Sequence, residues 1–197
     1  MKQDNRGMSL VELVIAMATA SIIMVVIVVF IATATKSYNS AQNTIDLQME
    51  SHVMMEQISA WIMEGNNVRV EQIAIGGQNV NAIIIYSIPR QVPEGRLPKG
   101  VAQDTHCTRR IIWMQGNGLY MKLKEQDTLM NPAETITSSD LVTDNAELPK
   151  YCICEYMMTF TPTWNATVNT VSVAVTLKAG TQEYKLENEF KVRNEIL

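Results

Sequence analysis

An uninterrupted apolar stretch near the N-terminus constrains this chain more than any other feature. Residues 13–35 are 23 consecutive residues without Asp, Glu, Lys or Arg. A helix of that length spans about 34 Å, which is enough to cross the hydrocarbon core of a bilayer. The stretch is longer than the apolar region of a secretory signal peptide, which has about 7–15 residues. We therefore expect residues 8–35 to form a membrane helix that the mature protein keeps.

The charges on either side of this stretch predict its orientation. Lys2 and Arg6 precede it, whereas Lys36 follows it and is soon succeeded by Asp46 and Glu50. Because positive residues favour the cytoplasmic side of a membrane, we expect a cytoplasmic N-terminus and an extracytoplasmic C-terminal part. The sequence predicts a single-pass protein of the inner or plasma membrane.

A carboxylate stands immediately before the charge-free stretch. Glu12 follows Gly7 by five residues, within the string Met-Ser-Leu-Val-Glu-Leu that begins at Met8. A charged side chain near the membrane core costs a few kcal/mol, so its presence requires an explanation. One explanation is local: Glu12 lies at the membrane interface and interacts with the positive end of the helix dipole.

The segment from Lys2 to Met17 resembles the class III leader of type IV pilins and type II secretion pseudopilins. In that family a prepilin peptidase cuts after the glycine on the cytoplasmic side and methylates the new amine. The resemblance implies a leader of residues 1–7, cleavage between Gly7 and Met8, and N-methylation of Met8. The family usually has Phe where this chain has Met8, a departure to another apolar residue.

The resemblance also gives Glu12 a role in assembly. Cleavage leaves a cationic amine on Met8, and two buried opposite charges offset much of each other's burial cost. The family implies that the amine of one subunit meets Glu12 of another and sets the register of the filament. An intramolecular contact between Met8 and Glu12, four residues apart on one helical face, is the alternative.

The helical pattern continues beyond the membrane segment as far as Gly65. We expect one helix over residues 8–64, whose continuation at 36–65 is amphipathic. Its apolar positions at three- and four-residue spacing predict one stripe: Tyr38, Ala41, Ile45, Met54, Ile58, Trp61 and Ile62. Packing of this stripe on the chain's own C-terminal part is favoured over a coiled-coil stalk, because no heptad is sustained.

Residues 66–197 have the pattern of a β-rich domain. Expected strands cover residues 80–88, 109–115, 119–124, 151–160, 170–178 and 183–193, with a hairpin turn at Gly116-Asn117-Gly118. The predicted fold class is α+β, with an antiparallel sheet of five or six strands packed on the N-terminal helix. This resembles the pilin fold, in which the first half of the helix protrudes. The C-terminal hairpin, ending Phe190-Lys191-Val192-Arg193-Asn194, loosely resembles that of J-type pseudopilins.

The function that the resemblance implies is structural. The chain would be a subunit of a type IV pilus, or of a pseudopilus for type II secretion or DNA uptake (competence). Its partners would be the prepilin peptidase, other pilin or pseudopilin subunits and an assembly platform in the membrane. Major type IV pilins commonly have a proline within the protruding helix, whereas the first proline here is Pro89, so the resemblance favours a minor subunit. The alternative is a single-pass surface protein whose β domain binds a ligand or partner.

Other functions receive little support from the sequence. The net charge of −4 gives no basic field for nucleic acid, and Arg109-Arg110 with Trp113 is too small a cluster to contact DNA. Enzyme motifs such as a phosphate loop or a nucleophile elbow do not occur. We expect neither catalysis nor a cofactor.

The three cysteines are Cys107, Cys152 and Cys154. An exported domain would meet an oxidising environment, so a disulfide from Cys107 to one of the other two is an option, against reduced buried thiols. Cys152 and Cys154 are awkward partners for each other because strand neighbours two apart lie about 6.5–7 Å apart. His106 beside Cys107 has no visible third partner for nucleophilic catalysis.

The acidic segment 126–149 contains two weak candidates for a metal site. Some pseudopilins hold calcium in such a loop, which makes Asp140 and Asp144 weak candidates, although the spacing fits no EF-hand. Asn165-Ala166-Thr167 matches a glycosylation sequence, which occurs by chance as readily as by function.

Overall fold

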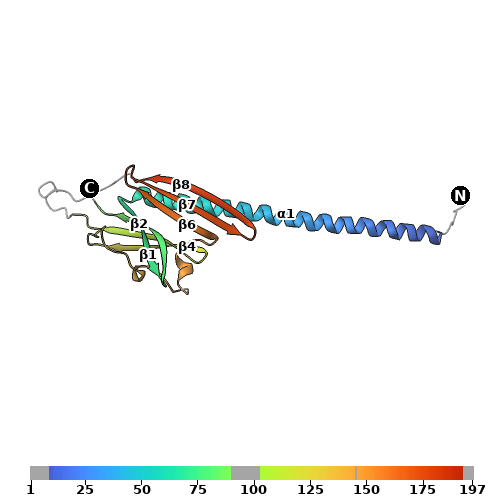
Figure 1. The fold of residues 1–197 in the computed structure, drawn as a ribbon, viewed down its shortest axis with the longest axis horizontal. Coiled ribbons are helices and arrows are strands. Elements are labelled where there is room, and N and C mark those ends of the chain that lie inside the picture. Colours follow the sequence, from blue (N-terminus) through green and yellow to red (C-terminus); the bar gives the residue numbers. More distant parts are fainter. Residues whose placement is uncertain (1–8, 90–102, 145, 193–197) are drawn as a thin grey trace. The chain divides into compact units, whose positions relative to one another are not determined.

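The structure is a computed structural model, and it describes residues 9–89, 103–144 and 146–192. The chain divides into two compact units, residues 1–43 and 44–197, and the boundary falls inside the long helix α1 (Leu10–Glu64). The fold class is α+β, as the sequence predicts: one long N-terminal helix is followed by antiparallel strands (Figure 1).

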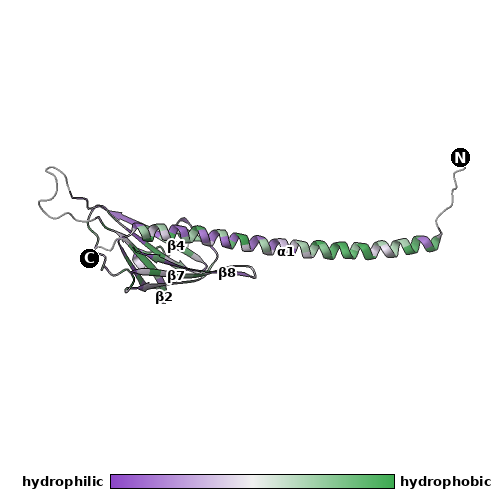
Figure 2. Cartoon of the chain, turned by 90° about the horizontal axis from the view of Figure 1, so that it is seen from above, coloured by the Kyte–Doolittle hydropathy of each residue, from purple (hydrophilic) through white to green (hydrophobic). Residues whose placement is uncertain are grey.

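The first unit consists of the N-terminal part of α1. Its side chains from Leu10 to Asn39 are all exposed, and Figure 2 shows apolar residues along this stretch. The hydroxyls of Thr19, Ser21, Thr33 and Thr35 donate to carbonyls three or four residues earlier in the same helix. The charge-free stretch 13–35 therefore satisfies its side-chain hydroxyls within the helix, as is required of a helix in a membrane. Within the described residues, α1 is the one helix long and apolar enough to cross a membrane.

The second unit contains the rest of α1 and two antiparallel sheets. The first sheet has the strand order β1 (Asn67–Ile75), β2 (Gln78–Ser87), β3 (Cys107–Gln115), β4 (Gly118–Gln126) and β5 (Cys152–Cys154). The second has the order β6 (Met157–Asn165), β7 (Thr170–Ala179) and β8 (Gln182–Lys191). Two short 3-10 helices, Ser138–Asp140 and Leu148–Tyr151, interrupt the segment between β4 and β5.

Two hydrophobic clusters form the core of this unit. The first joins α1 residues such as Ile58 to one face of the first sheet, including Ile83, and to the second sheet, including Val173. The second lies on the opposite face of the first sheet, where Trp113 and Leu141 are buried together. Alternation along β2 explains the division, because Ile83 and Ile85 belong to the first cluster while Ile84 belongs to the second.

The strand pattern corrects the sequence expectation in three ways. The strand β1 was not predicted. The expected strand 151–160 is two strands in different sheets, β5 and β6, and the expected single sheet is two sheets. The break falls at Glu155 and Tyr156, where the chain leaves the first sheet and enters the second. The predicted hairpin between β3 and β4 is confirmed, with Gly116 at a φ of 60°.

Candidate functional site

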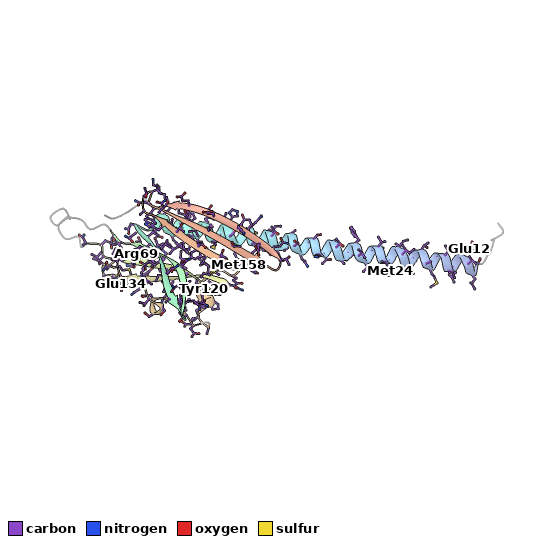
Figure 3. All side chains as sticks on the ribbon, viewed as in Figure 1. Glu12, Met24, Arg69, Tyr120, Glu134 and Met158 are labelled. Atoms are coloured by element: carbon purple, nitrogen blue, oxygen red, sulfur yellow. The ribbon has the colours of Figure 1, made fainter. Side chains whose placement is uncertain are left out.

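Glu12 lies in the first turn of α1, where Figure 3 shows it at the N-terminal end of the helix. The backbone N–H of Ser9 donates to Glu12 Oε2 at 2.9 Å, and the N–H of Val11 donates to Ser9 Oγ at 3.3 Å. Ser9 therefore acts as the N-cap, and Glu12 reaches back to it as in a capping box. Glu12 therefore interacts with the N-terminal end of its own helix, and it does so by accepting a hydrogen bond from the N–H of Ser9.

The other residues of the leader motif lie beyond the part of the chain that the structure describes. Gly7 and Met8 fall outside the described residues, so the cleavage site and any contact between Met8 and Glu12 stay predictions. The capping contact was not anticipated, although the spacing of Ser9 and Glu12 is that of a capping box.

The second-unit part of α1 has two apolar faces rather than one. Its buried face consists of Leu47, Ser51, Met54, Met55, Ile58 and Ile62. Ile45, Met49 and Val53 are 49%, 63% and 53% exposed. At about 100° per residue, these three lie on the side of the helix opposite the buried face. The expectation that these apolar residues form one buried stripe is wrong. Met54, Ile58 and Ile62 are buried, whereas Tyr38 and Ile45 are exposed.

The exposed stripe, defined as Ile45, Met49 and Val53, has acidic surroundings. Residues 44–64 contain four carboxylates and no Lys or Arg. Glu50 Oε1 accepts the backbone N–H of Glu155 at 2.7 Å, and Glu64 pairs with Arg110 at 3.1 Å. These two carboxylates therefore attach the helix to the strands.

A buried arginine anchors the acidic segment to the first sheet. Arg109 is 2% exposed, and its guanidinium contacts Asp140 Oδ1 at 2.5 Å and Glu134 Oε2 at 3.2 Å. Arg69 adds a hydrogen bond to the carbonyl of Glu134 at 2.8 Å. The side chain of Asp140 thus neutralises a buried cation.

The same contacts bear on the calcium candidates. Burial opposes ionisation of Asp140, but the N–H of Thr137 and the guanidinium of Arg109 outweigh it and lower the pKa of Asp140 below its ordinary value. Asp144 accepts the N–H of Ala146 at 2.9 Å through Oδ1. Among the described residues, no group of three or more His, Cys, Asp or Glu is placed to hold a metal ion.

The structure does not bring Cys107 to the other two cysteines, and all three are free thiols. Cys107 belongs to the second hydrophobic cluster and Cys154 to the first, so they lie on opposite faces of the first sheet. Along β4, the partner of Cys107 is Gln126 and the partner of Cys152 is Tyr120, which places the two cysteines about 20 Å apart along the strand. Burial, together with the neighbouring Glu50 carboxylate, raises the pKa of Cys154 to about 12. That thiol is therefore protonated and unreactive at neutral pH.

His106 immediately precedes β3, and its ring Nδ1 is 3.0 Å from Asp127 Oδ1. The hydrogen bond to Asp127 raises the pKa of His106 above its ordinary value. The imidazole is paired with a carboxylate on the exposed surface rather than with Cys107.

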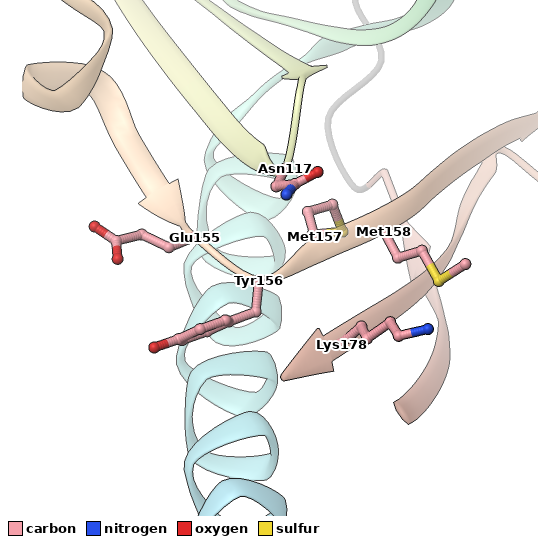
Figure 4. Close-up of a pocket in the computed structure, with 6 residues that line it drawn as sticks. All are labelled: Asn117, Glu155, Tyr156, Met157, Met158 and Lys178. Atoms are coloured by element: carbon pink, nitrogen blue, oxygen red, sulfur yellow. The ribbon is translucent and has the colours of Figure 1, made fainter. Parts of the chain in front are cut away.

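A small pocket lies where the two sheets meet. It has a volume of about 210 Å³ and is lined by Asn117, Glu155, Tyr156, Met157, Met158 and Lys178 (Figure 4). Lys178 Nζ pairs with Glu183 at 3.1 Å, and its backbone N–H donates to the carbonyl of Tyr156. The pocket is smaller than the roughly 300–1,000 Å³ typical of ligand sites.

Comparison of the chain with protein-family models, with characterised proteins and with solved structures finds no match. Conclusions about its function therefore depend on its own residues.

Proposed function

We propose that this chain is a pilin-like structural subunit, minor rather than major, of a type IV pilus or a related pseudopilus. The prepilin peptidase would process it in the membrane, and an assembly platform would then add it to a filament of related subunits. Its N-terminus would be cytoplasmic and its β-rich part extracytoplasmic. The observation that carries the proposal is the order Gly7, Met8 and Glu12 directly before the charge-free helix.

The exposed helix supports this proposal. The side chains from Leu10 to Asn39 lack contacts that bury them within the chain. An apolar surface of this extent must be covered by lipid or by other protein. Lipid would cover this apolar surface while the subunit is in the membrane, and neighbouring helices would cover it after assembly into a filament.

Glu12 can cap its own helix and also pair with the Met8 amine of a neighbouring subunit. A carboxylate has two oxygens that accept about four hydrogen bonds, and the N–H of Ser9 occupies one of these acceptor positions on Oε2. The remaining capacity is available to the methylated amine of Met8 on a neighbouring subunit. The capping contact would then orient the carboxylate before the neighbour arrives.

The exposed stripe on α1 is a second surface that a helix bundle would cover. Ile45, Met49 and Val53 face away from the chain's own core. The charge-free segment 13–35 of a neighbouring subunit is a suitable contact, because it brings no carboxylate near the acidic flanks of the stripe. This arrangement would bury apolar surface that the single chain leaves exposed.

The proposal is tested by changing the cleavage site. The full chain and a Gly7→Ala variant are produced together with the prepilin peptidase, and the mass of each product is measured. The wild-type chain loses residues 1–7 and Gly7→Ala accumulates uncut. If both chains keep residues 1–7 in the presence of an active peptidase, the proposed function is wrong.

A further inference from the structure

The turn between β6 and β7 carries the one Asn-x-Ser/Thr sequence of the chain, Asn165-Ala166-Thr167. The strand β6 ends at Asn165 and β7 begins at Thr170, so the motif occupies the hairpin turn. Asn165 and Thr167 are both exposed. The sequence alone does not distinguish a functional motif from a chance match, but its position at an exposed turn does favour function.

The backbone of the turn presents the asparagine in a bent conformation. Asn165 Oδ1 accepts the N–H of Thr167 at 3.1 Å, which forms an Asx turn. Asn169 has a φ of 53°, so the chain reverses direction within these residues. With its oxygen directed to Thr167, the side chain of Asn165 is held at the tip of the hairpin.

Apart from Pro162 in β6, the hairpin has little protection against association through its edge. Residues 156–177 contain no Asp, Glu, Lys or Arg, and β6 is an edge strand of its sheet. Thr159, Thr161 and Thr163 are exposed along β6, and Val168 at the turn is 48% exposed. Charged side chains commonly prevent edge strands from pairing with other chains, and none is present here. A bulky hydrated group at the turn would supply that protection.

We propose that Asn165 is the acceptor of an N-linked oligosaccharide. In the reaction, Asn165 Nδ2 forms a bond to C1 of the reducing-end sugar and releases one proton to a basic group of the transferring enzyme. The bond between C1 and the phosphate oxygen of a polyprenyl pyrophosphate-linked oligosaccharide breaks, and the lipid pyrophosphate leaves. The modification requires that the β-rich unit be exported, but it does not require filament assembly.

The test is peptide mass mapping of the full-length protein isolated from its natural source. The peptide that contains Asn165 is expected to be heavier by at least one sugar residue than the sequence predicts. In chains expressed in the same source, Asn165→Gln and Thr167→Ala abolish the added mass. Thr167→Ser retains it because the hydroxyl is kept, and Asn169→Gln retains it because that residue is outside the motif.

Two results would overturn the assignment. One is a peptide in which Asn165 carries no added mass in the natural source. The other is an added mass that persists in Asn165→Gln, which would place the sugar on another residue. Neither result bears on cleavage after Gly7, so this inference and the proposed function can fail separately.

Discussion

Glu50 and Glu155, 105 residues apart in the sequence, are joined by a hydrogen bond of 2.7 Å from the backbone N–H of Glu155 to Glu50 Oε1. The contact connects α1 to the point where the chain passes from the first sheet to the second. The Glu50 carboxylate therefore links α1 to the connection between β5 and β6.

Removal of this acceptor should destabilise the protein. Glu50→Ala removes this hydrogen bond at an exposed position, where water can replace the acceptor, so the expected cost is roughly 0.5–1.5 kcal/mol in the free energy of unfolding. Glu50→Gln keeps a carbonyl oxygen and should lose less. Denaturant unfolding of the full chain in detergent measures the effect. Exposed Glu56→Gln is the control and should change stability by less than about 0.5 kcal/mol. Equal effects of Glu50→Ala and Glu56→Gln would contradict this account.

The ion pair between Arg109 and Asp140 predicts a pH dependence. The folded-state pKa of Asp140 is lowered, so the unfolded state binds its proton more tightly. The stability that this group contributes is present above the unfolded pKa of about 3.9 and is lost as the pH falls through the folded pKa. Asp140→Asn should therefore destabilise the protein at pH 7, and the difference from the wild type should shrink below pH 4.

Unfolding curves at several pH values test this prediction. Asp144→Asn serves as the control, since Asp144 bonds to the N–H of Ala146 whereas Asp140 bonds to a buried guanidinium. A difference between Asp140→Asn and the wild type that stays constant from pH 7 to pH 2 would show that the carboxylate charge contributes no stability.

The two apolar faces of α1 predict opposite phenotypes. Ile58 is fully buried, and Ile58→Ala should cost roughly 2–5 kcal/mol in the free energy of unfolding. Val53 is 53% exposed, so Val53→Ala should change unfolding by less than about 0.5 kcal/mol. If the exposed stripe is an assembly surface, Val53→Ala should nevertheless reduce the amount of filament. Wild-type amounts of filament in a stably folded Val53→Ala, Met49→Ala double variant would argue against that role.

Two substitutions of Glu12 separate its capping of the helix from its negative charge. Glu12→Gln keeps an oxygen that accepts the N–H of Ser9 but removes the negative charge, whereas Glu12→Ala removes both. Both variants should enter the membrane, and both should assemble poorly if the carboxylate pairs with an amine of another subunit. Membrane fractionation and filament yield are the measurements. Normal assembly of Glu12→Gln would mean that capping is the only function of this residue.

The features of the fold that depend on local patterns were predictable from the sequence. The charge-free run and Gly65 place the long helix, and alternation in residues 170–178 places β7. The sequence does not predict β1, because its apolar residues, including Val70 and Ile73, do not alternate strictly. The sequence predicts one apolar stripe that combines exposed Ile45 with buried Ile58, because spacing alone does not show which of two apolar faces packs against the core.

Long-range contacts were beyond the sequence analysis. Arg109 meets Glu134 and Asp140 at separations of 25 and 31 residues. No local pattern indicates such pairs, and the sequence alone presents Arg109 and Arg110 only as a weak basic cluster. Their ion pairs with the acidic segment and with Glu64 depend on the register of β3 with its neighbours.

We propose that the charge-free helix of the mature protein is preceded by an amine released by cleavage after Gly7, which pairs with Glu12 of another subunit. Mass spectrometry of the N-terminal peptide of the membrane-extracted protein tests it most directly. The account predicts a peptide that starts at Met8 and carries one methyl group on its amine. A working protein whose first peptide still contains residues 1–7 would contradict it.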